Sequence, residues 1–219
     1  MARNKPAAGR SLMQMILDRL HTALGGEQMD LKTLQQRYAS ELMPYTFTYT
    51  FSEGDRKKQK AVLEFDKGNF CHLFSIGSIV KNQTPDLEPF SGMKGWNNIE
   101  DGKITFRMLR RIDPQQFDYY HPEHMMFSEL VETIKNPQAV RFEKKRVKNS
   151  SLEADIILYR IWKQKVIHVA LSEDDDGTWF PRSYFVRDLE KDRTYPSKYI
   201  CNMPVLKVKS SIRPRISRP

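Results

Sequence analysis

The stretch Tyr45-Thr-Phe-Thr-Tyr-Thr-Phe51 decides the fold class of this chain, because aromatic residues alternate strictly with threonines. A period of two places successive side chains on opposite faces of a β-strand. Four aromatic rings therefore line one face of a predicted strand, and three hydroxyl side chains line the other. The turn residues Glu53-Gly-Asp55 then lead to a second strand, predicted at roughly 60–65. The apolar face of this hairpin needs another layer to cover it.

Segments with helical periodicity, before and after the hairpin in the sequence, predict that layer. Predicted helices lie at 11–24, 30–43, 70–80, 105–111 and 122–135, with Ser11, Asp30, Asn69 and Thr105 as N-caps. The segment 82–102 is polar and contains several prolines and glycines, so we expect it to be the longest loop.

A second strand-rich region follows the last helix. Runs with alternating apolar residues predict strands near 139–146, 154–162, 165–171 and 179–187, joined by short turns. Helices first and consecutive antiparallel strands last indicate an α+β fold, in which N-terminal helices pack on a mainly antiparallel β-sheet with a C-terminal four-stranded meander.

The net charge of +9 is concentrated at the two ends of the chain. Residues 1–10 contain three basic side chains and no acid, and residues 205–219 contain five and no acid. We therefore expect a flexible basic arm at 1–10, a helical element at 11–44, the main domain at 45–204 and a disordered basic tail at 205–219. Such arms would contact phosphates without reading a base sequence.

Several classes of protein are disfavoured. No apolar run approaches the roughly 18 residues that a membrane span needs, and no signal-peptide pattern follows the N-terminus. Cys71 and Cys201 are far apart in the sequence and fit reduced thiols, so we expect a cytoplasmic protein. Phosphate-binding glycine loops, dinucleotide and zinc motifs and nucleophile elbows are absent. The acids at 174–176 fit a solvated turn. The sequence thus predicts no cofactor and no metal.

Scattered polar residues remain as candidates for chemistry. His72, His168, Ser183 and Tyr159 are the types that RNA cleavage without a metal requires, since RNA supplies its own 2′-hydroxyl nucleophile. A base removes the hydroxyl proton, an acid protonates the leaving oxygen, and cations stabilise the charged phosphorane. The structural alternatives are a core-edge histidine at 72 and a packed strand histidine at 168. Strand alternation predicts that His168 projects from the face opposite the larger apolar one.

Two basic groups in the body of the chain are candidates for phosphate contacts. Arg107, Arg110 and Arg111 have no acid among them, and Lys144, Lys145 and Arg146 belong to a second basic run. Solvated faces are the alternative interpretation of both groups.

The order of several short motifs resembles the phage polyvalent-protein nuclease family, within the Barnase–EndoU–Colicin–RelE superfamily of ribonuclease folds. The matching segments are Val62–Phe65, Asn69–Phe74, Trp96–Thr105, the helix with Phe127 and Leu130, Ala154–Leu158, Val166–Leu171 and Pro181–Phe185. The match would cover about residues 45–200.

The resemblance implies an α+β ribonuclease fold, metal-independent RNA cleavage and use as a toxin or phage effector. By position, His72, His168 and Ser183 fall in the matching motifs, and an arginine such as Arg107 would clamp the phosphate. The chain departs from the family after the histidine, where it has Ser75 and Ser78 in place of a glycine and a basic residue. Lys81 is the predicted substitute for that basic residue.

Three hypotheses follow. The first is an endoribonuclease that acts by 2′-hydroxyl attack on tRNA, mRNA or ribosomal RNA and is restrained by a cognate antitoxin. The second is a non-catalytic module that binds RNA or the ribosome. The third is a protein-interaction module of a phage or a defence system. Steep salt dependence of RNA binding favours the second, and a stoichiometric protein partner favours the third.

Overall fold

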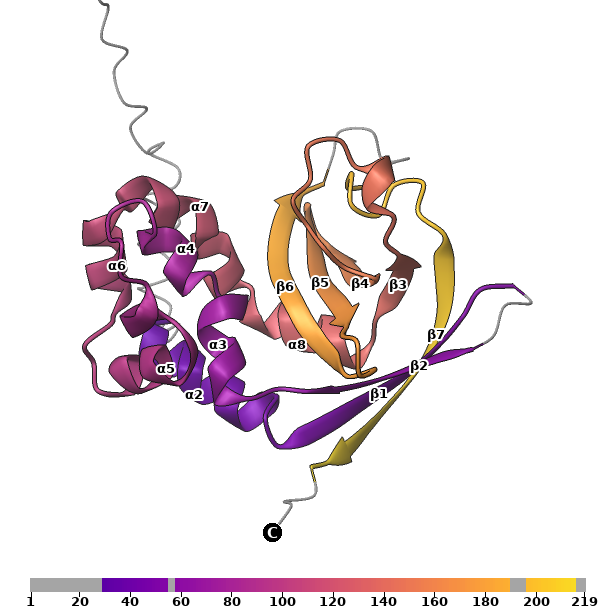
Figure 1. Ribbon diagram of the computed structural model, residues 1–219, viewed down its shortest axis with the longest axis horizontal. Coiled ribbons are helices and arrows are strands. Elements are labelled where there is room, and N and C mark those ends of the chain that lie inside the picture. Colours follow the sequence, from indigo (N-terminus) through magenta and orange to yellow (C-terminus); the bar gives the residue numbers. More distant parts are fainter. Residues whose placement is uncertain (1–28, 55–57, 190–195, 216–219) are drawn as a thin grey trace, which may run out of the picture. The chain divides into compact units, whose positions relative to one another are not determined.

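The computed structural model describes residues 29–54, 58–189 and 196–215, so the predicted basic arm and the helix at 11–24 lie outside the described residues. Its centre is a curled sheet of seven antiparallel strands, in the order β2-β1-β7-β3-β4-β5-β6 (Figure 1). The strands are β1 (Tyr45–Ser52), β2 (Gln59–Glu64), β3 (Gln138–Arg141), β4 (Ile156–Trp162), β5 (Lys165–Glu173), β6 (Trp179–Asp188) and β7 (Val205–Pro214). The predicted α+β class and the antiparallel meander are confirmed.

The predicted hairpin forms as β1 and β2, and its faces divide as the alternation requires. Phe47, Tyr49 and Phe51 are buried, and the threonines between them lie on the opposite face. The Tyr49 hydroxyl donates to the carbonyl of Ile134, 2.8 Å away, which ties the hairpin to the helical layer. Burial of each such ring contributes about 1.5–3 kcal/mol.

The helices differ from the prediction in where they break. They are α2 (Leu31–Glu41), α3 (Lys67–Leu73), α4 (Ile76–Val80), α5 (Gly92–Glu100), α6 (Phe106–Ile112), α7 (Pro114–Met125) and α8 (Phe127–Lys135), with two short 3-10 turns, η1 (Glu88–Phe90) and η2 (Lys144–Arg146). One predicted helix at 70–80 is in fact two, because Ser75 adopts a left-handed conformation with φ 56°. Thr105 caps α6 as predicted, by accepting a hydrogen bond from the amide of Met108.

Two further predictions about helices are wrong. The expected loop at 82–102 contains η1 and α5, and α5 buries Trp96 and Ile99 in spite of its glycines. The helix predicted from Pro122 starts earlier, as α7 at Pro114, where Asp113 caps it and a proline fits the first turn.

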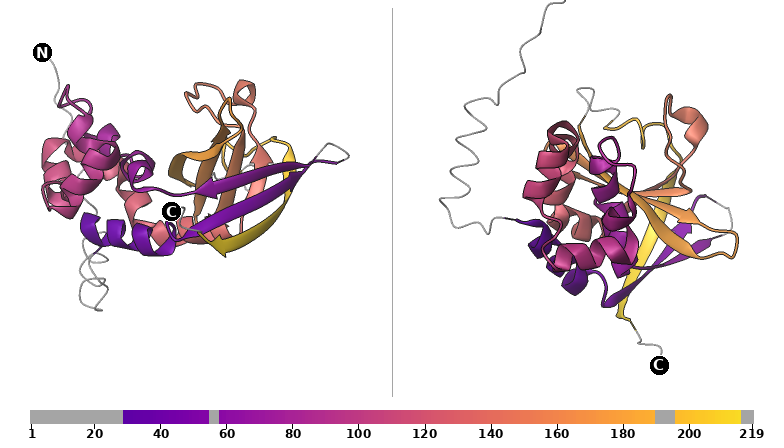
Figure 2. Two further views of the ribbon diagram at one scale, coloured as in Figure 1. Left: turned by 60° about the horizontal axis from the view of Figure 1, so that its bottom comes forward. Right: turned by 60° about the vertical axis from the view of Figure 1, so that its left-hand side comes forward.

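The predicted disordered tail is wrong for residues 205–214, which form β7. This strand pairs with β1 along eight residues and with β3 at its start (Figure 2). Leu206 is 3% exposed, whereas Lys207 and Lys209 on the other face are exposed. The charged residues on one face of β7 hid its amphipathic pattern. Without β7, the facing edges of β1 and β3 would lack a hydrogen-bonding neighbour.

His168 lies in a second apolar core, on the sheet face that the segment 197–203 covers. This core contains Val140, Phe142, Val147, Ile157, Val166, Ala170, Phe185, Ile200 and Met203. The His168 ring stacks on Phe185 with centroids 4.5 Å apart, its Nε2 lies 2.9 Å from the Ser197 hydroxyl, and it is 0% exposed. Burial lowers the pKa of His168 to about 3. The prediction that this face of β5 is open is therefore wrong.

Gly95 permits the close approach of α5 to α3 and η1. A Cβ atom there would lie 2.6 Å from the Cys71 sulfur and 2.8 Å from the carbonyl carbon of Phe90. Gly95→Ala should therefore lower the free energy of unfolding by about 1–3 kcal/mol, the usual cost of overpacking. Gly68→Ala is the matched control, because a Cβ at this helical glycine meets nothing within 4 Å. Equal thermal melting curves for the two variants would contradict this packing.

The neutral, buried His168 makes the protein sensitive to acid. Because its folded-state pKa of about 3 lies below the ordinary value of 6.5, its contribution is present above pH 6.5 and is lost as the pH falls toward 3. Between pH 7 and pH 5 this loss amounts to about 2 kcal/mol. Urea unfolding at both pH values should show a smaller loss for His168→Gln than for the wild type. A loss in His168→Gln as large as that in the wild type would contradict this linkage.

Candidate functional site

A hollow of about 230 Å³ opens between α3, α4 and η1. Its polar lining consists of His72, Ser75, Ser78, Lys81 and Ser91, and its apolar lining includes Leu87 and Phe90. Two residues predicted for chemistry, His72 and Lys81, thus lie in the wall of one concave site. A concave site with an apolar base and a few convergent polar groups is the usual form of a binding site.

The local fold of α3 places His72 at this hollow. Asp66 and Asn69 form a capping box at the start of the helix, in place of the predicted cap at Asn69 alone. Phe70, Cys71 and Leu73 face the core, so His72 between them is exposed. The helix pattern alone therefore directs the imidazole outward.

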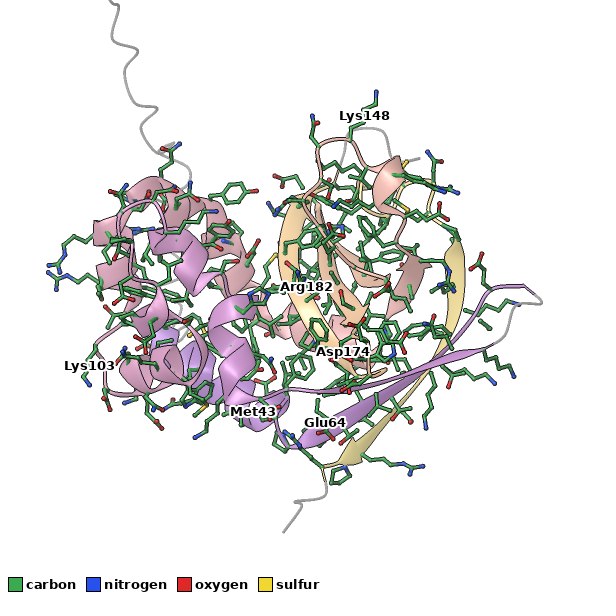
Figure 3. All side chains as sticks on the ribbon, in the orientation of Figure 1. Met43, Glu64, Lys103, Lys148, Asp174 and Arg182 are labelled. Carbon is green, nitrogen blue, oxygen red and sulfur yellow. The ribbon has the colours of Figure 1, made fainter. Side chains whose placement is uncertain are left out.

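A backbone contact fixes the orientation of the His72 ring. Its Nε2 lies 2.6 Å from the carbonyl oxygen of Arg182 in β6 (Figure 3 labels Arg182 beside α3). A carbonyl only accepts, so Nε2 carries the hydrogen and donates it. In the neutral ring, Nδ1 then holds the free lone pair and is able to accept a proton.

Behind the hollow lies a buried carboxyl group, Glu123 of α7. It is 1% exposed, and the Ser75 hydroxyl donates to its Oε2 at 3.4 Å. Arg187 of β6 brings its Nη1 within 3.5 Å of the other oxygen, Oε1. That contact lacks hydrogen-bond geometry, so Oε1 has no hydrogen-bond partner among the described residues.

Burial raises the pKa of Glu123 to about 8, although Arg187 and the hydrogen bonds from Ser75 and the Val186 backbone oppose the rise. The carboxyl group therefore carries its proton at neutral pH. A strongly shifted carboxyl group next to a concave site is typical of functional centres.

Aromatic and hydroxyl groups hold this region in place. The Tyr184 hydroxyl donates to the carbonyls of Glu123 and Met126, which joins β6 to the end of α7. The Arg187 guanidinium lies over the rings of Tyr119 and Phe185, at 5.5 and 5.0 Å. Arg187 thus reaches from β6 to α7 and lies partly exposed between them.

Three of the predicted catalytic residues lie elsewhere. In the strand register, Tyr159 pairs with His168, and Ser183 pairs with Ala170, two residues further along β5. Tyr159, His168 and Ser183 therefore share the sheet face of the second core, and Tyr159 packs against that core. The structure brings these three together, but none of them lines the hollow.

The arginines of α6 form a separate group. Arg110 makes an ion pair with Asp118 at 3.0 Å and stacks over the Phe117 ring at 4.7 Å. Arg107 and Arg111 are exposed on the same short helix. The hollow does not include any of the three.

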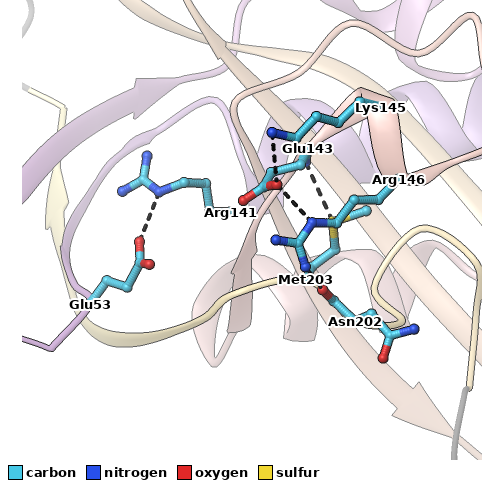
Figure 4. A network of polar contacts seen from close by, with 7 residues as sticks. All are labelled: Glu53, Arg141, Glu143, Lys145, Arg146, Asn202 and Met203. Atoms are coloured by element: carbon cyan, nitrogen blue, oxygen red, sulfur yellow. Dashed lines mark hydrogen bonds and ion pairs between the residues drawn. The ribbon is translucent and has the colours of Figure 1, made fainter.

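The basic group at 144–146 is engaged in local contacts. Lys144 pairs with Glu153, while Lys145 and Arg146 both approach the Glu143 carboxylate, at 3.8 and 2.7 Å (Figure 4). Arg146 also donates to the carbonyl of Asn202. Much of this positive charge is therefore compensated at short range.

Sequence reasoning did not identify Glu123, Arg182 or Arg187 as parts of the site. Glu123 lies beside buried His124 in a helix of mixed polarity, and no pattern distinguishes a buried glutamate there from a solvated one. Arg182 contributes only its main-chain carbonyl, which side-chain reasoning cannot identify. For Arg187, the one signal in the sequence is that a basic residue follows the aromatic Phe185 two positions later, on the same face of the strand.

The described part of the chain lacks two features. No three histidine, cysteine or acidic side chains gather there in a way that could hold a metal ion. None of the helices in the described ranges is both long and apolar enough to span a bilayer.

Comparison with known proteins identifies the family. The model of PBECR4, the phage-Barnase-EndoU-ColicinE5/D-RelE like nuclease, matches residues 30–209, which include every strand of the sheet except the end of β7. No curated protein and no solved structure matches the chain significantly. The match covers most of the sequence, including the hollow and Glu123. The chain therefore belongs to the phage Barnase–EndoU–Colicin–RelE-like nuclease family, which implies a nucleic-acid substrate.

Proposed function

We propose that the protein is an endoribonuclease that cleaves RNA by attack of the 2′-hydroxyl group, without a metal ion, at the hollow beside α3 and α4. The observation that carries the proposal is that His72 and Lys81 line the same hollow, in a chain of a nuclease family. RNA brings the nucleophile, so the protein needs to supply only proton transfer and positive charge.

His72 is the proposed general base. Its Nδ1 takes the proton of the 2′-hydroxyl group, while the Arg182 carbonyl holds Nε2–H and so fixes the ring. The 2′-oxygen then bonds to phosphorus, and the bond from phosphorus to the 5′-oxygen breaks. The product is a 2′,3′-cyclic phosphate and a 5′-hydroxyl end.

Glu123 is the proposed source of the second proton, acting through Ser75. The Ser75 hydroxyl lines the hollow and contacts the Glu123 carboxyl group behind it. In this relay the Ser75 hydroxyl turns its hydrogen toward the leaving 5′-oxygen and, as that proton is transferred, accepts the proton of Glu123 in place of donating to Oε2. Lys81, exposed at the end of α4, would stabilise the charge on the phosphorane.

The remaining predicted residues have no direct part in this scheme. Catalytic roles for His168, Ser183 and Tyr159 stay predictions, and the burial of His168 counts against direct contact with RNA. Arg107, Arg110 and Arg111 and the group at 144–146 stay predicted phosphate contacts outside the hollow. We also propose that RNA cleavage by this protein is toxic to the cell that contains it.

His72→Ala should lower the rate of RNA cleavage in the presence of EDTA by about 100-fold or more, the usual contribution of a general base. His168→Gln should retain a rate near that of the wild type per folded molecule, because its ring is sealed in the second core. Rates on single-stranded RNA, with the product ends identified, test both expectations.

Two outcomes would contradict this assignment. Intact RNA with folded wild-type protein would remove the catalytic proposal and favour a binding module. A loss in His168→Gln as large as that in His72→Ala would move the reaction to the face beneath residues 197–203.

Growth arrest on expression of the wild type, relieved by His72→Ala, would support the toxin role.

Glu123→Gln should change the pH profile of cleavage as well as its rate. Since the pKa of Glu123 is raised to about 8, the wild-type rate should fall as the pH rises through that value and the proton is lost. Glutamine has no such proton, so the variant should be slower at pH 7 and lack this alkaline limb. Ser75→Ala should be slow in the same way. An unchanged profile in Glu123→Gln would reduce the residue to a structural partner of Arg187.

A further inference from the structure

Strands β2, β1 and β7 lie side by side, and one face of this part of the sheet points outward. None of its residues lines the hollow. The inward residues of β1 are buried aromatics, so its threonines and their cross-strand partners face outward. On this face Thr50 lies between Lys60 and Lys209, Ser52 is opposite Lys207, and Thr46 is opposite Arg213. We call Lys60, Lys207, Lys209 and Arg213, with the hydroxyl residues between them, the lysine face.

Within the described part of the chain, no ion pair compensates the charge of the lysine face. Its four cations are exposed, and none of them makes an ion pair with a described residue. The only carboxylate among its strand residues is Glu64, at one end of β2. Arg215 already pairs with Glu64 at 3.0 Å, and the Thr46 hydroxyl donates to it at 2.7 Å.

The strands set the spacing of the cations. Along β7, alternate side chains lie about 7 Å apart, and the two strands that flank β1 lie about 10 Å apart. The hairpin and β7 are hydrogen-bonded along their lengths, so the backbone holds this spacing. The Thr50 hydroxyl lies between Lys60 and Lys209, and the Thr48 hydroxyl, one alternate position along β1, lies beside Ser211. Both hydroxyls are able to donate to phosphate oxygens.

We propose that the lysine face is a second nucleic-acid site, which binds the sugar–phosphate backbone of the substrate outside the hollow. Four fixed cations match a polyanion, and the nuclease family identifies that polyanion as a nucleic acid. The strand residues of this face include no aromatic side chain on which a base could stack. It therefore holds the strand without reading its sequence and keeps the substrate on the protein. The inference relies on the family, and on the proposed function only in placing cleavage at the hollow.

Binding of single-stranded oligo-deoxythymidylate tests this inference, because DNA lacks the 2′-hydroxyl group that the proposed cleavage requires. Lys207→Gln/Lys209→Gln should raise the Kd about fivefold or more. It should also make the slope of log K against log salt less negative by about 1.4, since each lost phosphate contact on a single strand contributes about 0.7. Lys60→Gln, on a different strand, should shift both quantities in the same direction.

Lys103→Gln/Lys148→Gln is the control for net charge, because it removes two exposed charges away from these strands, one of which, Lys103, pairs with Asp101 (both lysines are labelled in Figure 3). The control should bind almost as the wild type does. Equal weakening by both pairs would mean that only net charge matters and would overturn the inference. So would unchanged binding in Lys207→Gln/Lys209→Gln together with Lys60→Gln, with melting curves showing that the variants are folded.

Failure of this inference can be told apart from failure of the proposed function. On cleavable RNA, Lys207→Gln/Lys209→Gln should raise KM and leave kcat unchanged. His72→Ala should lower kcat and bind oligo-deoxythymidylate as the wild type does. A fully active His72→Ala would overturn the assignment of the hollow and leave the lysine face intact.

Discussion

The pairing of β7 with two partners is the constraint on which the rest of the structure depends. The β1–β2 hairpin and the β3–β6 meander have no ladder to each other among the described residues except through this strand. The chain leads directly from the hairpin into α3, so the hairpin position determines where His72 meets β6. A segment near the C-terminus thus sets the distance between residues that are more than 100 positions apart in the sequence.

Comparison of β7 with the other strands explains which strands could be predicted from the sequence and which could not. Strict alternation identified β1, and alternating apolar runs identified β4, β5 and β6, because one or both of their faces are buried. β7 has only a weak apolar row, with Leu206 buried and Val208 half-buried, and five basic residues from position 207 onward suggested disorder. Its order comes from hydrogen bonds to strands far away in the sequence, which local composition does not encode.

The candidate site divides in a similar way. His72 and Lys81 were identified as residue types that suit the chemistry, and the break at Ser75 that lets α3 and α4 line one hollow was not. A left-handed serine has no signature of its own, because glycine is the residue normally expected there. The glycine that the resembling family has in this stretch was the one hint. His168 was predicted from its strand position. Alternation assigned its face correctly relative to Ile167, but it cannot reveal that the segment 197–203 returns to cover that face.

The burial of the Glu123 carboxyl group behind the hollow is costly, which supports the proposed role of this residue in proton transfer. A buried carboxyl group costs several kcal/mol unless it is well paired, and here one oxygen faces Arg187 without hydrogen-bond geometry. A glutamine, or an apolar residue of similar volume, would avoid that cost. The acid lies one hydrogen bond from a concave site. Burial raises its proton affinity, and the Arg187 guanidinium lowers it. Such opposed influences bring a carboxyl pKa close to neutrality, where proton transfer is most effective.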